Sequence, residues 1–416
     1  MKIKRGLLLL LPFVAGCIDQ NETHNKNKDQ FKGYEEIREL KEVAFGDIDR
    51  SRVNKISVDL DKKNDEVDLK KVIDSVSFIR LEMSQNSIIG HIDKVYFDDG
   101  KIFVVDRTSA KAIFIFDDQG NFINKIAAVG KAPNEFLEIQ DVAIDKENKR
   151  IVLLDLAGRR CIFFNYNGDY SFGRQMYFYF SGLEIVDSSH IAFSTETAAN
   201  DHLPSINNNY LLVGDFQGKV FSKDFPYRDA DRAFTYFNEY PVKRFGQHVF
   251  FNPRFNDTLF EVTANRLIAR YALEIQHGGI PVEYRTTLTD SKLIDLSARY
   301  SYFNGEYVQA GNVLFAKINS PQSQQYIFTC TSSGNVLFGN RLNITDPSYN
   351  FFRTPIAIRS DHEMVGWIGA DELTRFGRSL RKIKQTRWLN ERFTGLLKNL
   401  SDNDNPVLFV YKIKDF

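Results

Sequence analysis

The stretch KAIFIFDDQGNFINKI, residues 111–126, predicts a β-strand, a tight polar turn and a second strand. Gly120 lies in the turn, where glycine takes a positive φ without steric cost. The stretch CIFFNYNGDYSF, which begins at Cys161, repeats this pattern with Gly168 in the turn. Two copies of one hairpin in the same chain indicate an internal repeat.

The hairpin recurs further along the chain, and its spacing gives the size of the repeat. GDFQGKVF and TSSGNVLF place turn glycines at positions 218 and 334. The intervals between the four glycines are 48, 50 and 116 residues, and the last is twice 58. The unit without a glycine is RFNDTLFEVTANRLIARYALEI, whose turn uses Ala264-Asn265.

The repeat extends upstream of the hairpin. KIFVVD (101–106) aligns with RIVLLD (150–155), and a further strand precedes each of them. Four strands in about 48 residues is the size of a β-propeller blade. The apolar pattern has period 2, which excludes a solenoid of helix pairs. The length from residue 70 to 416 accommodates six blades.

Two segments interrupt the strand pattern and predict helical insertions, at 285–303 and 370–400. The second insertion carries apolar residues at helical spacing, and we expect this stripe to dock on the propeller wall, with docking on a partner as the alternative. The stripe consists of Leu373, Phe376, Leu380, Ile383, Leu389, Phe393 and Leu397. Because open edge strands invite aggregation, we expect segments 67–82 and 405–416 to close the ring in one composite blade. The predicted fold is therefore an all-β, six-bladed β-propeller with two helical insertions.

The first 17 residues, MKIKRGLLLLLPFVAGC, have a basic start and an apolar run too short to span a bilayer. Their end, VAGC, resembles the lipobox of bacterial lipoproteins. This resemblance implies that Cys17 is lipidated and that the protein is an outer-membrane lipoprotein of the cell envelope, periplasmic or surface-facing. An ordinary secretory signal is the alternative. Residues 18–66 are predicted to be a polar tether, and residues 67–416 the propeller.

The balanced charge composition excludes a strong net electrostatic field around the protein. Lys and Arg number 54, as do Asp and Glu, so nothing pulls the whole protein toward nucleic acid, and membrane contact is expected only through the lipid on Cys17. The 36 Phe and 18 Tyr favour β-structure. Cys161 and Cys330 lack Cys or His partners at metal-ligand spacing. We expect both to be small buried hydrophobes, with a disulfide as the alternative.

Three segments carry a family resemblance. GKAPNEFLEIQDVAID (130–145), PRFNDTLFEV (253–262) and DNPVLFVYKIK (404–414) resemble the NHL-like six-bladed β-propeller lipoproteins of Bacteroidetes. In the first motif Ala132 replaces the second glycine of the family pattern. The resemblance covers the chain from about residue 67 onward. It implies the fold and supplies no catalytic residues.

No catalytic motif is visible: the sequence has no Gly-x-Ser-x-Gly elbow, phosphate loop or HExxH. A metal ring in the channel would need histidines at one blade position, but His91, His190 and His248 fall in different registers. No metal or cofactor is predicted. Asp106 and Asp155 end equivalent strands. We expect them to cap turns; a pair of catalytic carboxylates is the alternative.

The best candidate for a binding site is the segment 130–136, which connects two blades. Such connections lie near the channel mouth, where propellers bind ligands. The predicted ligand-binding residues are Lys131, Asn134, Glu135, Arg107 and Arg159, with Arg160 beside the last. Alternatively, Gly, Pro and Phe136 set the step between blades while Glu135 bonds the backbone.

The function predicted from these features is an envelope binding module for a protein, peptide or glycan, either a monomer or a subunit of an outer-membrane complex. One alternative is a propeller enzyme, a lyase or hydrolase with a site at the channel mouth. Another is a purely structural subunit. The sequence names no ligand.

Overall fold

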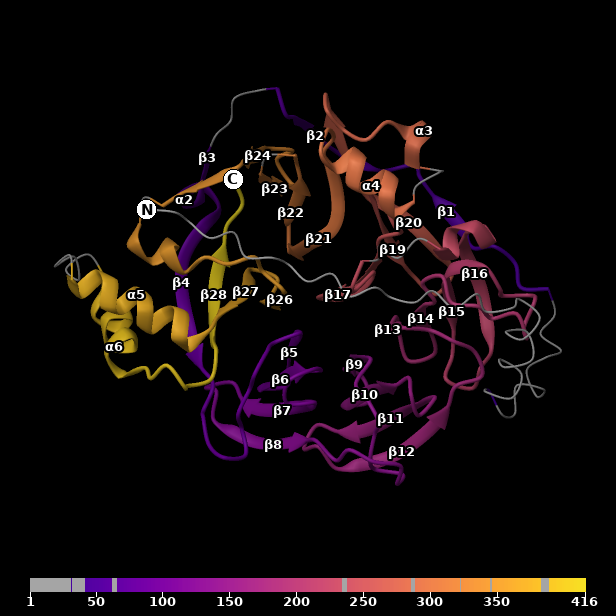
Figure 1. Ribbon diagram of the computed structural model, residues 1–416, viewed down its shortest axis with the longest axis horizontal. Helices are drawn as coiled ribbons and strands as arrows, with labels where there is room; N and C mark the ends of the chain where they lie inside the picture. Colours follow the sequence, from indigo (N-terminus) through magenta and orange to yellow (C-terminus); the bar gives the residue numbers. More distant parts are fainter. Residues whose placement is uncertain are drawn as a thin grey trace, which may run out of the picture.

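The computed structural model describes residues 31, 42–61, 66–233, 238–285, 289–321, 323–344, 346–382 and 389–416. Six blades, each built on four antiparallel strands, surround a central axis (Figure 1). The protein is thus a six-bladed β-propeller, as the repeat predicts.

Each blade begins with its innermost strand and proceeds outward. The first blade contains β5 (Lys94–Asp98), β6 (Lys101–Asp106), β7 (Ala112–Asp117) and β8 (Phe122–Ile126), and the second β9 (Asp141–Asp145), β10 (Arg150–Asp155), β11 (Arg160–Asn165) and β12 (Tyr170–Gln175). The third contains β13 (Gly182–Ile185), β14 (Ile191–Ser194), β15 (Asn209–Gly214) and β16 (Val220–Pro226), and the fourth β17 (Val242–Phe245), β18 (His248–Phe251), β19 (Thr258–Val262) and β20 (Arg266–Gln276). The fifth contains β21 (Tyr302–Ala310), β22 (Val313–Asn319), β23 (Gln324–Cys330) and β24 (Val336–Gly339), and the sixth β26 (Ala357–Ser360), β27 (Glu363–Ile368), β28 (Val407–Ile413) and β4 (Ile73–Arg80).

The repeated hairpin is the outer pair of strands in its blade. The turn glycines at positions 120, 168, 218 and 334 have φ of 89°, 87°, 86° and 76°, in the left-handed region that the motif predicts. In the fourth blade Ala264-Asn265 turns between β19 and β20, closed by Thr263 N donating to Arg266 O at 3.0 Å.

The sixth blade closes the ring. Its strand β28, near the C-terminus, pairs antiparallel with β4, from Val407 opposite Arg80 to Ile413 opposite Ile73. This confirms the prediction that the two ends of the chain meet in one composite blade.

The segment before β4 differs from the prediction of a polar tether over 18–66. Strands β1 (Asp47–Asp49) and β2 (Asn54–Asp59) pair in parallel with β20, and β3 (Glu66–Asp68) pairs with β25 (Arg341–Asn343) beside the fifth blade. The prediction of a tether is wrong for these residues. Apolar and polar side chains alternate in NKISVD (54–59), so Ile56 and Val58 are buried when β2 pairs with the otherwise open edge of β20.

We call residues 42–61 and 66–72 the N-terminal belt. Phe45 bridges Lys223 of the third blade before β1 reaches the fourth. The short helix α2 (Leu69–Val72) then leads into β4. The belt therefore passes the outer edges of successive blades (Figure 1). Cys17 lies outside the described residues.

Helices lie outside the ring (Figure 1). The first insertion forms α3 (Val282–Arg285) and α4 (Asp290–Ser297), and the second forms α5 (Ala370–Lys382) and α6 (Glu391–Asn399). Short 3-10 helices span Asp229–Ala233 and Pro347–Phe351. The apolar stripe of the second insertion docks on the wall as predicted: Phe393 is buried and stacks on Phe351 with ring centroids 4.8 Å apart. Ile383 lies outside the described residues.

Cys161 and Cys330 are buried and unbonded to each other, as expected. Cys161 lies in the apolar core between the second and third blades. Burial raises the pKa of its thiol well above the usual range.

Candidate functional site

The segment 130–136 is held together largely by its own hydrogen bonds. Gly130 N donates to Phe136 O at 2.9 Å, and Phe136 N donates to Ala128 O at 3.0 Å. The Glu135 carboxylate accepts a hydrogen bond from Ala132 N at 2.9 Å. Glu135 therefore forms a hydrogen bond with the backbone of its own loop, as the alternative interpretation of this segment predicts.

Asp106 and Asp155 cap turns, which makes the structural interpretation correct for both. Asp106 accepts hydrogen bonds from Gly90 N at 2.8 Å, His91 N at 2.9 Å and Ser109 N at 2.8 Å. Asp155 does the same for the backbone of the second blade, receiving Gly158 N at 3.0 Å and Leu137 N at 3.2 Å.

The structure separates the five residues predicted to bind a ligand. Arg107 lies at the rim of the central channel, where its guanidinium donates to the Tyr240 hydroxyl at 2.9 Å. Lys131 and Arg159 instead line a depression on the second blade. Asn134 is exposed on its loop. The structure thus brings Lys131 and Arg159 together and places Arg107 at a different site.

A cavity of about 510 Å³ occupies the central channel. Its walls come mainly from the inner strands of five blades, β5, β13, β17, β21 and β26. The charged and aromatic residues in these walls include Lys94, Tyr96, Glu184, Tyr240, Lys243, Arg244, Glu306, Tyr307 and Trp367. No sequence motif pointed to this group of residues.

One wall of the cavity is organised by Lys94. Its ammonium forms an ion pair with Asp141 at 2.6 Å and lies 4.7 Å from the centre of the Tyr240 ring. The Asp141 carboxylate also accepts Leu183 N at 3.0 Å. These contacts tie the first, second, third and fourth blades together around a compensated charge.

Glu184 projects from β13 and is only 2% exposed. The Tyr96 hydroxyl lies 3.4 Å from one carboxylate oxygen, Oε1. Among the described residues, the other oxygen, Oε2, has no hydrogen-bond partner. Burial raises the pKa of Glu184 to about 7, against the attraction of Lys94 and Arg244. This side chain therefore changes charge near neutral pH.

Lys243, on β17, faces the same cavity. Its ammonium donates to Gly305 O at 2.9 Å and lies 4.6 Å from the centre of the Tyr307 ring. Burial lowers the pKa of Lys243 to about 8, and Glu306 opposes that shift. The buried Tyr307 hydroxyl finds no hydrogen-bond partner within the described part of the chain.

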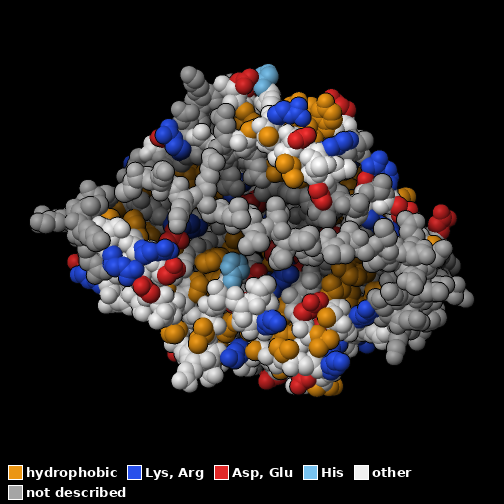
Figure 2. All heavy atoms as spheres, viewed as in Figure 1, with side chains coloured by type: hydrophobic (Ala, Val, Ile, Leu, Met, Phe, Trp, Pro, Cys, Tyr) orange, Lys and Arg blue, Asp and Glu red, His pale blue; other side chains and the backbone are white. Residues whose placement is uncertain are grey.

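The arrangement suits a polar ligand of low net charge. Positive and negative side chains are paired or alternate around the cavity, and Figure 2 shows basic and acidic groups intermixed on the face seen there. Unpartnered donor and acceptor atoms are buried within the walls. Such atoms form hydrogen bonds with a ligand that supplies the complementary groups.

A signal for this site was present in the sequence. Glu184, Lys243 and Arg244 lie on strands β13 and β17, which run closest to the axis. Charged residues in an innermost strand are expensive to bury unless they are paired or functional. The strand order of each blade was predicted, but which side chains of an inner strand face the channel was not.

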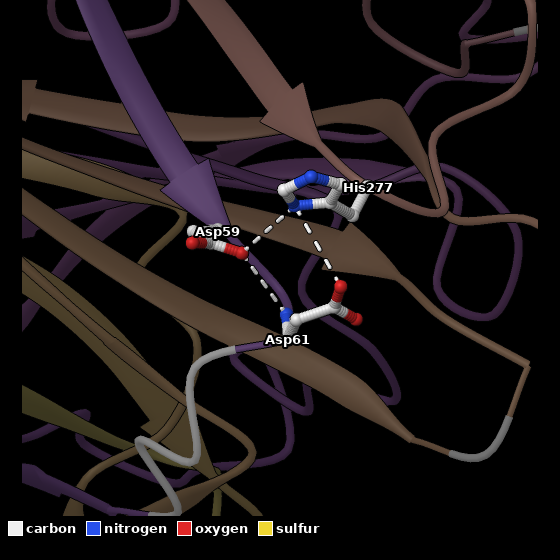
Figure 3. A group of neighbouring side chains, drawn as sticks. All are labelled: Asp59, Asp61 and His277. Atoms are coloured by element: carbon white, nitrogen blue, oxygen red, sulfur yellow. Dashed lines mark hydrogen bonds and ion pairs between the residues drawn. The ribbon is translucent and has the colours of Figure 1, made fainter.

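Among the described residues, one group of His and carboxylate side chains lies within metal-ligand range. Asp59, Asp61 and His277 point toward one another beyond β2, with their ligand atoms within 4.8 Å (Figure 3). Asp59 accepts Asp61 N at 3.2 Å and contacts His277 Nδ1 at 3.2 Å. Asp61 and His277 are exposed. These local contacts account for the arrangement without a ligand.

Comparison with solved structures supports the fold through one of them. A putative exported protein from Bacteroides fragilis NCTC 9343 aligns with a TM-score of 0.70 and 14% identity, covering 87% of this chain and 100% of that chain. A member of the duf4221 family from Bacteroides vulgatus ATCC 8482 aligns with a TM-score of 0.44 and 10% identity, covering 85% and 100%. No curated protein matches the sequence. In the part of the chain that the structure describes, no helix has the length and apolar character needed to cross a membrane.

The match that assigns the chain is to a family model. The model described as a domain of unknown function, DUF4934, matches residues 53–412. This range runs from the belt strand β2 to β28 in the closing blade. The chain belongs to the DUF4934 family.

Proposed function

We propose that this protein is a binding module of the cell envelope that takes part of a polar ligand into its central channel. The observation that carries the proposal is the set of buried atoms without partners among the described residues that line the cavity: Glu184 Oε2, the Tyr307 hydroxyl, Arg244 Nε and Asn238 Nδ2. Leaving a buried polar atom unpaired costs about 1–3 kcal/mol. A ligand that pairs with these atoms recovers that free energy.

The four atoms favour a ligand that can both donate and accept hydrogen bonds. A carboxylate oxygen accepts, guanidinium and amide nitrogens donate, and a phenol does both. Hydroxyl and amide groups offer both functions, so a segment of a glycan or peptide fits the chemistry better than a simple ion. The volume of about 510 Å³ lies within the usual range of small-ligand pockets.

The envelope location rests on the start of the chain and on its relatives in structure. The lipobox-like end of the first 17 residues supports lipidation at Cys17 and an outer-membrane lipoprotein, periplasmic or surface-facing. The similar Bacteroides fragilis structure is described as an exported protein, which supports export. The three motif segments, residues 130–145, 253–262 and 404–414, support membership of the NHL-like propeller lipoproteins.

The test uses a substitution that removes no hydrogen bond from the ligand-free protein. Tyr307→Phe removes a hydroxyl without a partner, so we expect unchanged stability and at least a tenfold loss of ligand capture from envelope extract. Tyr227→Phe is the matched control, because its hydroxyl donates to Ala198 O at 2.9 Å in the third blade, away from the channel. Native mass spectrometry and pull-down measure ligand capture by both variants. Equal capture by the two variants would contradict a channel site.

An enzyme is the second candidate, and one observation favours it. Glu184, with a pKa of about 7, and Lys243, with a pKa of about 8, line the same cavity. Groups that titrate near neutral pH suit acid–base catalysis, as in a lyase or hydrolase. Incubation of the captured ligand with the wild type and with Glu184→Gln decides between the functions. Product formed only by the wild type supports the enzyme, whereas intact ligand supports the binding module.

A further inference from the structure

A second concave site lies on the second blade, apart from the channel. This depression, with a volume of about 510 Å³, collects Lys131, Arg159, Arg160 and Arg174. No Asp or Glu is present among the described residues that line it. Since the whole chain has equal numbers of basic and acidic residues, four cations in one depression are a local concentration.

The turn between β10 and β11 fixes two of these arginines. Arg160 donates to the Asp155 carboxylate at 3.2 Å and to Glu135 O at 2.5 Å. Arg159 occupies the turn with a φ of 54°, and its guanidinium lies 5.2 Å from the centre of the Phe31 ring. Its Nη1 atom is buried and has no hydrogen-bond partner in the described chain. A donor is thus held in place without an acceptor.

The other two cations are exposed. Lys131 comes from the connection between the first and second blades, and Arg174 comes from the outer strand β12. Within the described residues, only Arg160 of the four cations forms an ion pair. Lys94 of the channel differs, since it is paired with Asp141 at 2.6 Å. Among the described residues, three of the four cations in the depression therefore have no compensating carboxylate.

We propose that this depression binds a tetrahedral oxyanion, a phosphate or sulfate ester group. Guanidinium groups match the oxygens of tetrahedral oxyanions with paired N–H donors, and an ammonium adds a point charge. Arg159 Nη1 supplies the buried donor, and Arg174 and Lys131 supply the exposed charge. The site does not depend on the channel, so it stands or falls independently of the proposed channel ligand.

The test measures binding of defined probes to the purified mature chain by calorimetry at low ionic strength. Glucose 6-phosphate is the ester probe, glucose is its neutral control, and inorganic phosphate and sulfate are the free oxyanions. We expect saturable binding of the ester and no heat with glucose. Lys131→Ala/Arg174→Ala should weaken binding of the ester at least tenfold, because two of the four cations are lost.

The matched control is Lys71→Ala/Arg359→Ala, which removes an exposed lysine from the N-terminal belt and an exposed arginine from the sixth blade. It should change the affinity less than twofold, and Tyr307→Phe should leave the affinity unchanged. Equal losses in both double variants, or no saturable oxyanion binding by the wild type, would overturn the proposal. Binding to vesicles containing phosphatidylglycerol without binding to any small oxyanion would assign the surface to a membrane and also overturn it.

Discussion

Asn405 joins the two ends of the chain and offers a direct test of ring closure. Its side chain is 2% exposed. The amide oxygen accepts a hydrogen bond from Ile89 N at 2.9 Å. The amide nitrogen donates to Glu82 O at 2.9 Å and to Ser87 O at 2.6 Å. One side chain thus fixes residues more than 300 positions earlier in the sequence, and we predict that Asn405→Ala strongly destabilises the protein.

The size of the effect follows from what each partner loses. Ile89 N and Ser87 O are left without these hydrogen bonds in a buried setting, at about 1–3 kcal/mol each. Glu82 O keeps the Ser87 hydroxyl at 2.8 Å, so its loss is smaller. The expected loss of unfolding free energy is roughly 3–5 kcal/mol.

Two further variants separate hydrogen bonding from packing. Asn405→Asp keeps the volume and an acceptor for Ile89 N, but an ionised carboxylate cannot donate to the two carbonyls. It should destabilise the protein at neutral pH at least as much as alanine. Asn124→Ala is the control, because it removes an exposed bond at 2.7 Å to Asn167 O between the first two blades. We expect that control to lose about 1 kcal/mol or less.

Urea unfolding, followed by circular dichroism, gives the free energy of unfolding of all three variants. The slope m is compared among them to check that unfolding exposes the same surface in each. The reasoning would be refuted if Asn405→Ala lost no more free energy than Asn124→Ala. It would also fail if Asn405→Asp were as stable as the wild type at neutral pH.

Three more predictions follow from the packing and the charges. Because burial raises the pKa of Glu184 from 4.5 to about 7, its contribution to stability is complete below pH 4.5 and is lost as pH rises through 7. Glu184→Gln should therefore gain about 3 kcal/mol relative to the wild type between pH 4 and pH 8 in urea unfolding; a pH-independent difference would contradict it. Phe393→Ala removes the ring stacked on Phe351 and should lower the unfolding free energy by about 3–5 kcal/mol without changing oxyanion binding. Cys17→Ser should move the protein from the membrane fraction to the soluble fraction on cell fractionation, whereas retention in the membrane fraction would rule out the lipid anchor.

The ring itself was predictable because its evidence is local. Each hairpin has its own turn glycine or Ala264-Asn265 turn, so the copies give five blades, and the length of the chain leaves room for a sixth. Closure was also predictable, since a ring has no free edge only if segments 67–82 and 405–416 pair. The belt was not, because parallel pairing of β2 with β20 joins Asn54 to Tyr271 and depends on which edge remains open after folding.

The site was only partly predictable, for a geometrical reason. Lys131, Arg159 and Arg107 follow strand ends that share a face of the ring, and the sequence gives that face. The sequence does not show how far each side chain lies from the axis. In the structure Arg107 lies at the channel rim, whereas Lys131 and Arg159 lie on the second blade. Likewise, Glu184 stands out as a candidate only when β13 is known to line the cavity.

The N-terminal belt has a consequence for biosynthesis. Its residues leave the ribosome before Lys223, β20 and β25, against which they pack. Strand β4 waits longest, because β28 is made more than 300 residues later. At about 5–20 residues per second this interval lasts tens of seconds, and an unpaired strand edge is prone to aggregate throughout it. A chain that ends before β28 would therefore leave β4 without its partner strand, and its exposed edge would favour aggregation over closure of the ring.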